Sequence, residues 1–194
     1  MTGKTERQGR IVVISGPSGV GKSTICKGMI DRLDNACLSV SATTRPKSKG
    51  EIDGKDYWFV SDDEFRRRIN EGLLLEYAEV FGHLYGTPKD KVEEVLQAGQ
   101  TVILEIDVQG GKQAKSLFSD AEMIFILAPS AKVLAKRLNG RGRDDEEIAE
   151  KRLRGAGIEI AAAWQYYEHM VINDDLQQAI DECVKIVQSA KRES

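Results

Sequence analysis

Short apolar runs alternate with amphipathic segments along most of the chain. Runs rich in aliphatic residues cover 10–15 (RIVVIS), 100–108 (QTVILEIDV) and 123–127 (MIFIL), and a shorter run covers 170–172. Such runs are typical of strands that are buried on both faces of a sheet. Between them, apolar residues recur at helical spacing, for example over 22–33 and 176–187. The alternation predicts an α/β fold with a mostly parallel sheet and helices on both of its faces.

Two segments, roughly 36–88 and 130–165, interrupt this alternation. The first holds a polar stretch, then a helix start at Ser61 with Glu64 three residues later, and a further helix with Pro88 at its first position. The second holds a long charged helix that runs from 146 to about 169. We expect both segments to be excursions from one core domain over 10–191. The expected boundaries are a flexible tail at 1–9, core segments at about 10–35, 89–129 and 166–191, and the two excursions.

The charge balance is close to neutral. The 194 residues include 28 Lys and Arg against 31 Asp and Glu, which gives 28 − 31 = −3. This balance provides no general attraction to nucleic acid or acidic membranes, and no apolar run approaches the ~20 residues that span a bilayer. The amino end lacks the apolar stretch of a signal peptide, and the three cysteines are scattered. We expect a cytoplasmic protein without a nucleic-acid or membrane partner, either a monomer or a homodimer.

Residues 16–23 read GPSGVGKS, which fits the phosphate-binding loop G-x-x-x-x-G-K-[ST]. Glycines let the backbone fold around an anion, and the helix that follows adds the positive end of its dipole. Lys22 can reach the β- and γ-phosphates of a nucleoside triphosphate, and the Ser23 hydroxyl can ligate Mg²⁺. Because a predicted strand precedes the loop and a predicted helix follows it, we expect a P-loop rather than a chance glycine-rich turn. The Asn/Thr-Lys-x-Asp motif of GTP switches is absent from the sequence.

Further motifs follow the P-loop in order along the chain. They are SATTR at 41–45, GEIDGKDY at 50–57, EYA at 76–78, YGT at 85–87 and DVQG at 107–110. With the P-loop, they resemble guanylate kinase over nearly the whole chain, from about residue 10 to 190. The resemblance implies a three-layer P-loop NTPase fold and an enzyme that phosphorylates GMP, and dGMP as well, with ATP and Mg²⁺. It also implies that the excursion at 36–88 binds GMP and that the excursion at 130–165 is a mobile lid.

The resemblance places Glu76 against the guanine base, with Ser41 and Thr87 near its O6 atom. Guanine has N–H donors at N1 and N2, so one carboxylate can accept from both while a hydroxyl donates to O6. Adenine would set a ring-nitrogen acceptor against Glu76 and leave buried polar groups unpaired. Without the resemblance, a solvated surface carboxylate is the alternative for Glu76.

The resemblance places Arg45, Tyr57 and Tyr85 around the GMP phosphate. Arg45 can bind a phosphate bidentately, and the tyrosines can donate neutral hydrogen bonds, although both tyrosines could instead be ordinary core aromatics. Guanylate kinases usually carry a second arginine three residues after the first.

This chain has Ser48 at the position of that second arginine, between Lys47 and Lys49. We expect one of the two lysines to supply the missing charge. A lysine is a point charge rather than a planar fork, so this arrangement predicts a GMP affinity that is sensitive to salt.

Glu105 and Asp107 lie two residues apart on a predicted strand, so their side chains are expected to share one face. At the end of a core strand beside a P-loop, a carboxylate can hold Mg²⁺ or its waters. A pair of surface charges is the alternative. The resemblance places both residues in the GMP region and favours Asp107, with Ser23, for the metal.

Arginines crowd the second excursion. The stretch 137–142 (RLNGRG) fits the family pattern R-L-x-x-R-G, and the resemblance implies that Arg137, Arg141 and Arg152 contact the phosphates when the lid closes. These arginines and Lys22 form the expected catalytic set, because phosphoryl transfer needs positioning and charge neutralisation more than covalent chemistry. No general base is needed, since the attacking phosphate oxygen is already anionic.

The resemblance also places the loop at Asn173 beside the ATP base. The residues expected to bind ATP are Gly16, Pro17, Ser18, Gly19, Val20, Gly21, Lys22, Ser23, Thr24 and Asn173. In the same loop, Asp174 or Asp175 could instead only cap the last helix. Two other functions stay open from the sequence: a non-catalytic guanylate-kinase-like interaction domain, and a kinase for another nucleoside monophosphate. The intact P-loop disfavours the first, and Glu76 with Thr87 disfavours the second.

Overall fold

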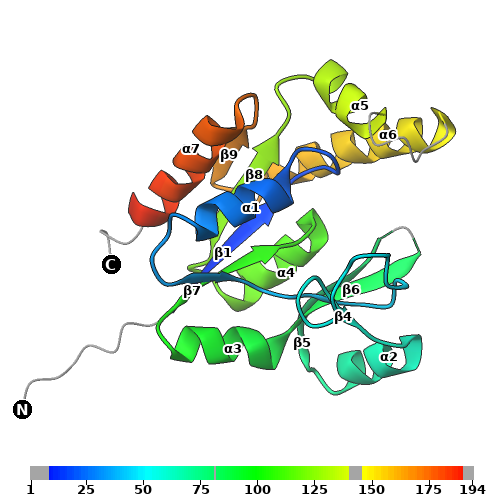
Figure 1. Ribbon diagram of the computed structural model, residues 1–194, viewed down its shortest axis with the longest axis vertical. Helices are drawn as coiled ribbons and strands as arrows, with labels where there is room; N and C mark the ends of the chain where they lie inside the picture. Colours follow the sequence, from blue (N-terminus) through cyan, green and yellow to red (C-terminus); the bar gives the residue numbers. More distant parts are fainter. Residues whose placement is uncertain (1–8, 81, 140–145, 190–194) are drawn as a thin grey trace, which may run out of the picture.

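The computed structural model describes residues 9–80, 82–139 and 146–189, which form an α/β fold with two sheets (Figure 1). The larger sheet contains β1 (Arg10–Ser15), β2 (Ala36–Leu38), β7 (Thr101–Glu105), β8 (Glu122–Leu127) and β9 (His169–Ile172). The smaller sheet contains β3 (Ala42–Thr43), β4 (Trp58–Phe59), β5 (Leu74–Val80) and β6 (His83–Pro88). The helices are α1 (Lys22–Ile30), α2 (Asp62–Asn70), α3 (Lys89–Gln97), α4 (Val108–Leu117), α5 (Ala131–Asn139), α6 (Glu146–Ala163) and α7 (Leu176–Ser189).

The larger sheet is parallel throughout, with the strand order β2-β7-β1-β8-β9. Successive residues of the central strand β1 point to opposite faces. Val12 and Ile14 pack with α1 and α7 on one face, whereas Ile11 and Val13 pack with α3 and α4 on the other. A strand covered on both faces is mainly apolar, which explains the uninterrupted apolar run from Ile11 to Ile14. The predicted three-layer arrangement is confirmed.

The carboxyl ends of two strands of the larger sheet lie side by side. β1 and β7 are parallel neighbours, and Ile14 is aligned with Glu105. The chain therefore enters the glycine-rich loop at Gly16 beside the end of β7. Ligands of open α/β sheets bind at this carboxyl edge, because the loops that follow the strands gather there.

The smaller sheet has the order β4-β3-β6-β5, and its two longest strands, β5 and β6, are antiparallel. β6 was not predicted from the sequence, because Gly86 and Pro88 interrupt its pattern. The prediction that Pro88 is the first helical residue is wrong by one position: Pro88 is extended and precedes α3 as its N-cap. The predicted start of α2 is confirmed, since the Ser61 hydroxyl accepts a 3.2 Å hydrogen bond from the Glu64 N–H.

Two predicted elements have different ends in the structure. The strand expected over 100–108 stops at Glu105, and α4 begins at Val108. The helix expected to reach about residue 169 stops at Ala163, and His169 pairs with Ile124 in the larger sheet as the first residue of β9.

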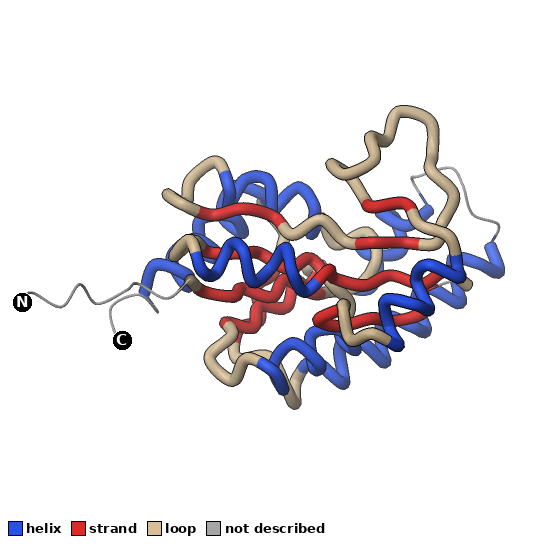
Figure 2. Tube along the Cα trace, turned by 90° about the horizontal axis from the view of Figure 1, so that it is seen from below, coloured by secondary structure: helices blue, strands red, loops and turns tan. Residues whose placement is uncertain are grey.

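β2 belongs to the larger sheet, and the first strand of the smaller sheet starts at Ala42. The smaller sheet and the pair α5 and α6 extend from the larger sheet toward the same side, on the right in Figure 1 and again in Figure 2. In the part of the chain that the structure describes, no helix has the length and apolar character needed to cross a membrane.

Candidate active site

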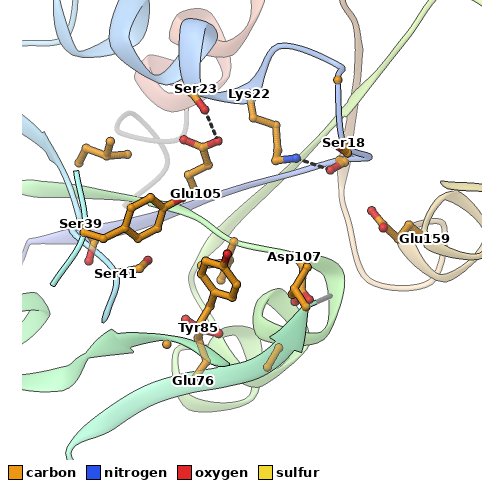
Figure 3. Close-up of a pocket in the computed structure, with 18 of the residues that line it drawn as sticks. Ser18, Lys22, Ser23, Ser39, Ser41, Glu76, Tyr85, Glu105, Asp107 and Glu159 are labelled. Carbon is orange, nitrogen blue, oxygen red and sulfur yellow. Dashed lines mark hydrogen bonds between the residues drawn. The ribbon is translucent and has the colours of Figure 1, made fainter. Parts of the chain in front are cut away.

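An open cleft of about 620 Å³ lies at the carboxyl edge of the larger sheet. The P-loop and the end of β7 form one wall, residues of the smaller sheet form another, and α6 contributes Gly155 and Glu159. Figure 3 shows Lys22, Ser23 and Glu105 at one end of the cleft and Glu76 and Tyr85 at the other. The cleft therefore brings two chemically different subsites into one space.

The P-loop is shaped by glycines at positions where other residues are strained. Gly19 has φ of 84° and Gly21 has φ of 98°, both in the left-handed region. Gly21 caps α1 without a side chain, so the helix amino end is left open to an anion. The Lys22 ammonium donates to the carbonyls of Gly16 (2.5 Å) and Pro17 (3.2 Å), so its charge is already held in the loop.

Lys22 and its neighbours form a charged cluster at the P-loop end of the cleft. Burial lowers the pKa of Lys22, while the carboxylates of Glu105 and Glu159 oppose this shift. The Ser23 hydroxyl donates a 2.6 Å hydrogen bond to Oε1 of Glu105. Serine and carboxylate oxygens side by side are hard ligands of the kind that Mg²⁺ prefers. Among the described residues, no group of three or more His, Cys, Asp or Glu side chains could hold a metal ion.

Glu76 lies at the opposite end of the cleft and is only 4% exposed. Its Oε1 accepts a 2.6 Å hydrogen bond from the Thr87 hydroxyl on the neighbouring strand. Burial raises the pKa of Glu76 to about 7, although the Thr87 hydrogen bond acts in the other direction. A Cβ at Gly110 would overlap Oε2 of Glu76, so a larger residue at that position of α4 would displace this carboxylate oxygen. Glu76 is not a solvated surface carboxylate.

Arg45 lies beside the cleft rather than in its lining. Both of its terminal nitrogens bond to the Glu51 carboxylate, at 2.7 and 3.1 Å, and Nη1 also bonds to the Ser48 hydroxyl at 3.0 Å. These bonds raise the pKa of Arg45 and lower the pKa of Glu51. The guanidinium lies 5.2 Å from the centre of the Tyr57 ring. Ser48 therefore helps to orient Arg45. Glu51 was not identified from the sequence as the partner of Arg45, although Glu51 lies in the motif at 50–57.

The prediction that Glu105 and Asp107 share a strand is wrong. β7 ends at Glu105, and Asp107 is the N-cap of α4, where its Oδ1 accepts a 2.8 Å hydrogen bond from the Gly110 N–H. Both side chains still line the cleft. The Ser23 hydroxyl, which was predicted to bind the metal, bonds to Glu105. Glu105 is therefore the acid beside that hydroxyl, whereas from the sequence Glu105 was expected in the GMP region.

A second, smaller cavity of about 240 Å³ lies against the P-loop. It is lined by Gly19, Val20, Gly21, Thr24, Arg137, Asn173, Asp174 and Leu176. Arg137 donates to the Asn173 carbonyl (3.0 Å), and the Asn173 amide donates to the Val20 carbonyl (2.7 Å). Asp175 caps α7 by accepting from the Gln178 N–H. Arg137 and Asn173 are thereby tied to the P-loop from outside the main cleft.

The structure separates the predicted site residues into those that line the main cleft and those that do not. The lining residues are Gly16, Ser18, Gly19, Gly21, Lys22, Ser23, Thr24, Ser41, Tyr57, Glu76, Tyr85, Glu105 and Asp107. Pro17, Val20, Arg45, Thr87, Arg137 and Asn173 are outside that lining. Arg141 lies outside the described residues, as does the side chain of Arg152. Glu159 was missed, because a single acid in a charged helix carries no sequence signal.

Comparison with known proteins shows the family of this chain. Residues 8–190 match the guanylate kinase family. The guanylate kinase of Synechocystis sp. is 46% identical over 184 residues, covering 95% of this chain and 96% of that protein. The guanylate kinase of Zymomonas mobilis is 47% identical, covering 94% and 83%. The crystal structure of guanylate kinase from Anaplasma phagocytophilum superposes with a TM-score of 0.78 at 34% identity, covering 95% of this chain and 87% of that one. The chain belongs to the guanylate kinase family.

Proposed function

We propose that this chain transfers the γ-phosphoryl group of ATP to GMP or dGMP, giving ADP and the corresponding guanosine diphosphate. One observation carries the proposal: a buried carboxylate, Glu76, faces the P-loop across a single cleft. A P-loop alone would be compatible with many phosphoryl acceptors. A carboxylate in a buried pocket selects an acceptor with adjacent N–H donors, and guanine is the common nucleobase that offers them at N1 and N2.

We assign the acceptor base to Glu76 and Ser41. The Thr87 hydroxyl has one proton, and it already donates that proton to Glu76. Thr87 therefore orients the carboxylate from behind, while Ser41, which lines the cleft, is the hydroxyl that donates to O6 of guanine. An adenine in this place would leave the carboxylate facing a ring nitrogen, which costs the desolvation of a buried charge.

We assign the GMP phosphate to Arg45, Tyr57 and Tyr85. The two tyrosine rings lie 5.9 Å apart and both line the cleft. Burial raises the pKa of Tyr57, so its hydroxyl keeps its proton and can donate it to a phosphate oxygen. Hydrogen bonds to Glu51 and Ser48 hold the Arg45 guanidinium beside the Tyr57 ring.

The donor side uses the P-loop and the smaller cavity. The triphosphate takes the place of the Gly16 and Pro17 carbonyls as the partner of Lys22, because a phosphate is a stronger acceptor for an ammonium group. The smaller cavity is lined by P-loop residues together with Arg137 and Asn173. We assign it to the adenine end of ATP.

Ser23 and Glu105 fit the requirements of Mg²⁺ that arrives with ATP. Their paired oxygens are suitable ligands for the ion or its waters, and Asp107 lies in the same cleft. When bound, Mg²⁺ neutralises charge on the β- and γ-phosphates. The described residues provide too few carboxylates to hold the ion alone, which suits an ion held mainly by phosphate and water.

The chemistry that remains is alignment and charge neutralisation. The GMP phosphate is already anionic near neutral pH, so none of the side chains in the cleft has to remove a proton. Lys22 and the predicted lid arginines Arg137, Arg141 and Arg152 offset the repulsion between the two phosphate groups. Closure of the predicted lid would exclude water, which otherwise accepts the phosphoryl group.

The direct test is a panel of phosphoryl acceptors. Purified protein is incubated with ATP and Mg²⁺ and with GMP, dGMP, AMP, CMP or UMP, and ADP release is measured. We expect GMP and dGMP to react, with kcat/KM about 100-fold or more above the other nucleotides. Equal rates with AMP would support a kinase of different specificity. Absence of turnover with every acceptor would support a non-catalytic interaction domain.

A further inference from the structure

A buried pair of hydroxyl groups lies directly behind the two halves of the cleft. Ser15 is the last residue of β1 and immediately precedes the P-loop, and it is fully buried. Its hydroxyl donates to the carbonyl of Ile106 at 2.8 Å and lies 3.3 Å from the carbonyl of Asp107. The Tyr167 hydroxyl lies 2.6 Å from the Ser15 hydroxyl.

The direction of these hydrogen bonds follows from the number of protons. Ser15 has one hydroxyl proton, and the carbonyls of Ile106 and Asp107 can only accept it. Tyr167 must therefore donate to Ser15. Burial raises the pKa of Tyr167, so this donor keeps its proton. The result is a chain of hydrogen bonds that runs from Tyr167 through Ser15 to the backbone between Glu105 and Asp107.

Tyr167 is held firmly in this position. Its ring packs against Phe125 with a centroid separation of 5.3 Å. Its neighbours in sequence also contact α4: the Lys112 ammonium lies 5.0 Å from the centre of the Tyr166 ring, and Lys115 pairs with Glu168 at 2.8 Å. The segment that returns from α6 to the larger sheet is therefore fastened to the helix that Asp107 caps.

Gly111 leaves the space that the Tyr167 hydroxyl needs. A Cβ at this position of α4 would overlap that hydroxyl, whereas the next Tyr167 atom, Cζ, would be 3.1 Å away. Glycine is a poor helix former, and its presence here is explained by the close approach of the Tyr167 hydroxyl.

We infer that Tyr167 is a positioning residue for phosphoryl transfer, acting through Ser15 to hold the P-loop and the Glu105–Asp107 backbone in one fixed relative placement. The inference rests on the proposed function, because it concerns the alignment of donor and acceptor. Each nucleotide subsite keeps its own contacts when the Tyr167 hydroxyl is removed. Only their relative position changes, and that position matters in the transition state more than in the binding of either substrate.

The test compares Tyr167→Phe with Tyr166→Phe. The second variant is a matched control, since the ring of Tyr166 rather than its hydroxyl contacts Lys112. We expect Tyr167→Phe to lower kcat about tenfold or more while both KM values change less than about twofold. Thermal unfolding is measured in parallel, and Tyr166→Phe should keep wild-type kcat. A kcat for Tyr167→Phe equal to wild type, or an equal loss in both variants, would overturn the inference.

Gly111→Ala provides an independent arm of the test. This variant should show the same loss of kcat, because the added methyl group displaces the Tyr167 hydroxyl. In the Tyr167→Phe background the same substitution should cost less than it does in the wild type, since the overlapping oxygen is gone and only the contacts with Tyr167 Cζ (3.1 Å) and Met123 Cε (3.3 Å) remain. Additive losses would contradict the inference. Wild-type turnover of GMP is measured first, so that failure of the proposed function is distinguished from failure of this assignment.

Discussion

Thr87 donates a 2.6 Å hydrogen bond to Glu76 across the antiparallel strands β5 and β6, where the two residues are aligned as partners. The bond holds a carboxylate in a pocket from which water is largely excluded. It also takes up one lone pair of Oε1, so the carboxylate is oriented before any ligand arrives. This relationship makes Glu76 a prepared acceptor for two N–H groups.

Replacing Glu76 tests this assignment. Glu76→Gln keeps the size of the side chain but turns one acceptor into a donor that faces the N–H groups of guanine. We expect kcat/KM for GMP to fall about 100-fold or more, because a buried, charge-assisted pair of hydrogen bonds is lost. Glu79→Gln, an exposed position on the same strand, is the control and should leave GMP kinetics unchanged. Steady-state kinetics give kcat/KM for GMP in both variants, and an equal value in the two would contradict the assignment of Glu76.

The raised pKa of Glu76 predicts that guanine binding depends on pH. The ionised form accepts the two N–H groups, so binding should weaken as pH falls below about 7, by about tenfold per pH unit. Guanosine is the suitable probe, because the GMP phosphate itself titrates near pH 6. The dependence should disappear in Glu76→Gln. An affinity of the wild type for guanosine that stays constant between about pH 8 and pH 6 would contradict this role of ionised Glu76.

The same group affects the stability of the free protein. Between its ordinary pKa of 4.5 and the raised value of about 7, Glu76 holds a proton in the folded state that the unfolded chain has already lost. The unfolding free energy contributed by this residue therefore falls as pH rises through that window. Urea unfolding at several pH values should show a smaller decline for Glu76→Gln than for the wild type. An identical decline would mean that Glu76 is already ionised in the free protein.

Glu105 is expected to support Mg²⁺ through its contact with Ser23. Glu105→Gln should raise the Mg²⁺ concentration needed for half-maximal activity about tenfold or more, because a charged partner of the metal-binding hydroxyl is lost. KM for GMP should change little. Glu93→Gln on the exposed surface of α3 serves as control. The measurement is activity as a function of Mg²⁺ concentration, and full activity should return at high Mg²⁺. A loss of activity that excess Mg²⁺ does not restore would argue against this role.

Lys47 and Lys49 are both exposed in the loop that carries Arg45. If they supply the charge that Ser48 does not, the double variant Lys47→Ala, Lys49→Ala should raise KM for GMP about threefold to tenfold at low ionic strength. The difference from wild type should shrink as salt is added, because exposed charges are screened. Lys91→Ala on α3 should leave KM unchanged. A KM for GMP that is unaffected in the double variant would remove both lysines from the acceptor site.

The P-loop part of the donor site was predictable from sequence because its elements are adjacent along the chain. Strand, glycine loop and helix lie within residues 10–30, and each has a local signature. The acceptor half is assembled from distant segments, and only the family resemblance pointed to it. β6 was missed because Gly86 and Pro88 hide its pattern, and α4 was not predicted because Gly110 and Gly111 are poor helix formers. The presence of these two glycines is explained only by the folded structure, in which Gly110 lies against Glu76 and Gly111 lies against Tyr167.

The most direct measurement is a crystal structure of this protein with GMP and a non-hydrolysable ATP analogue bound together. Our account predicts that the triphosphate occupies the P-loop and that the Glu76 carboxylate lies within hydrogen-bond distance of N1 and N2 of guanine. A guanine base bound elsewhere, with Glu76 bonded only to Thr87, would contradict the account.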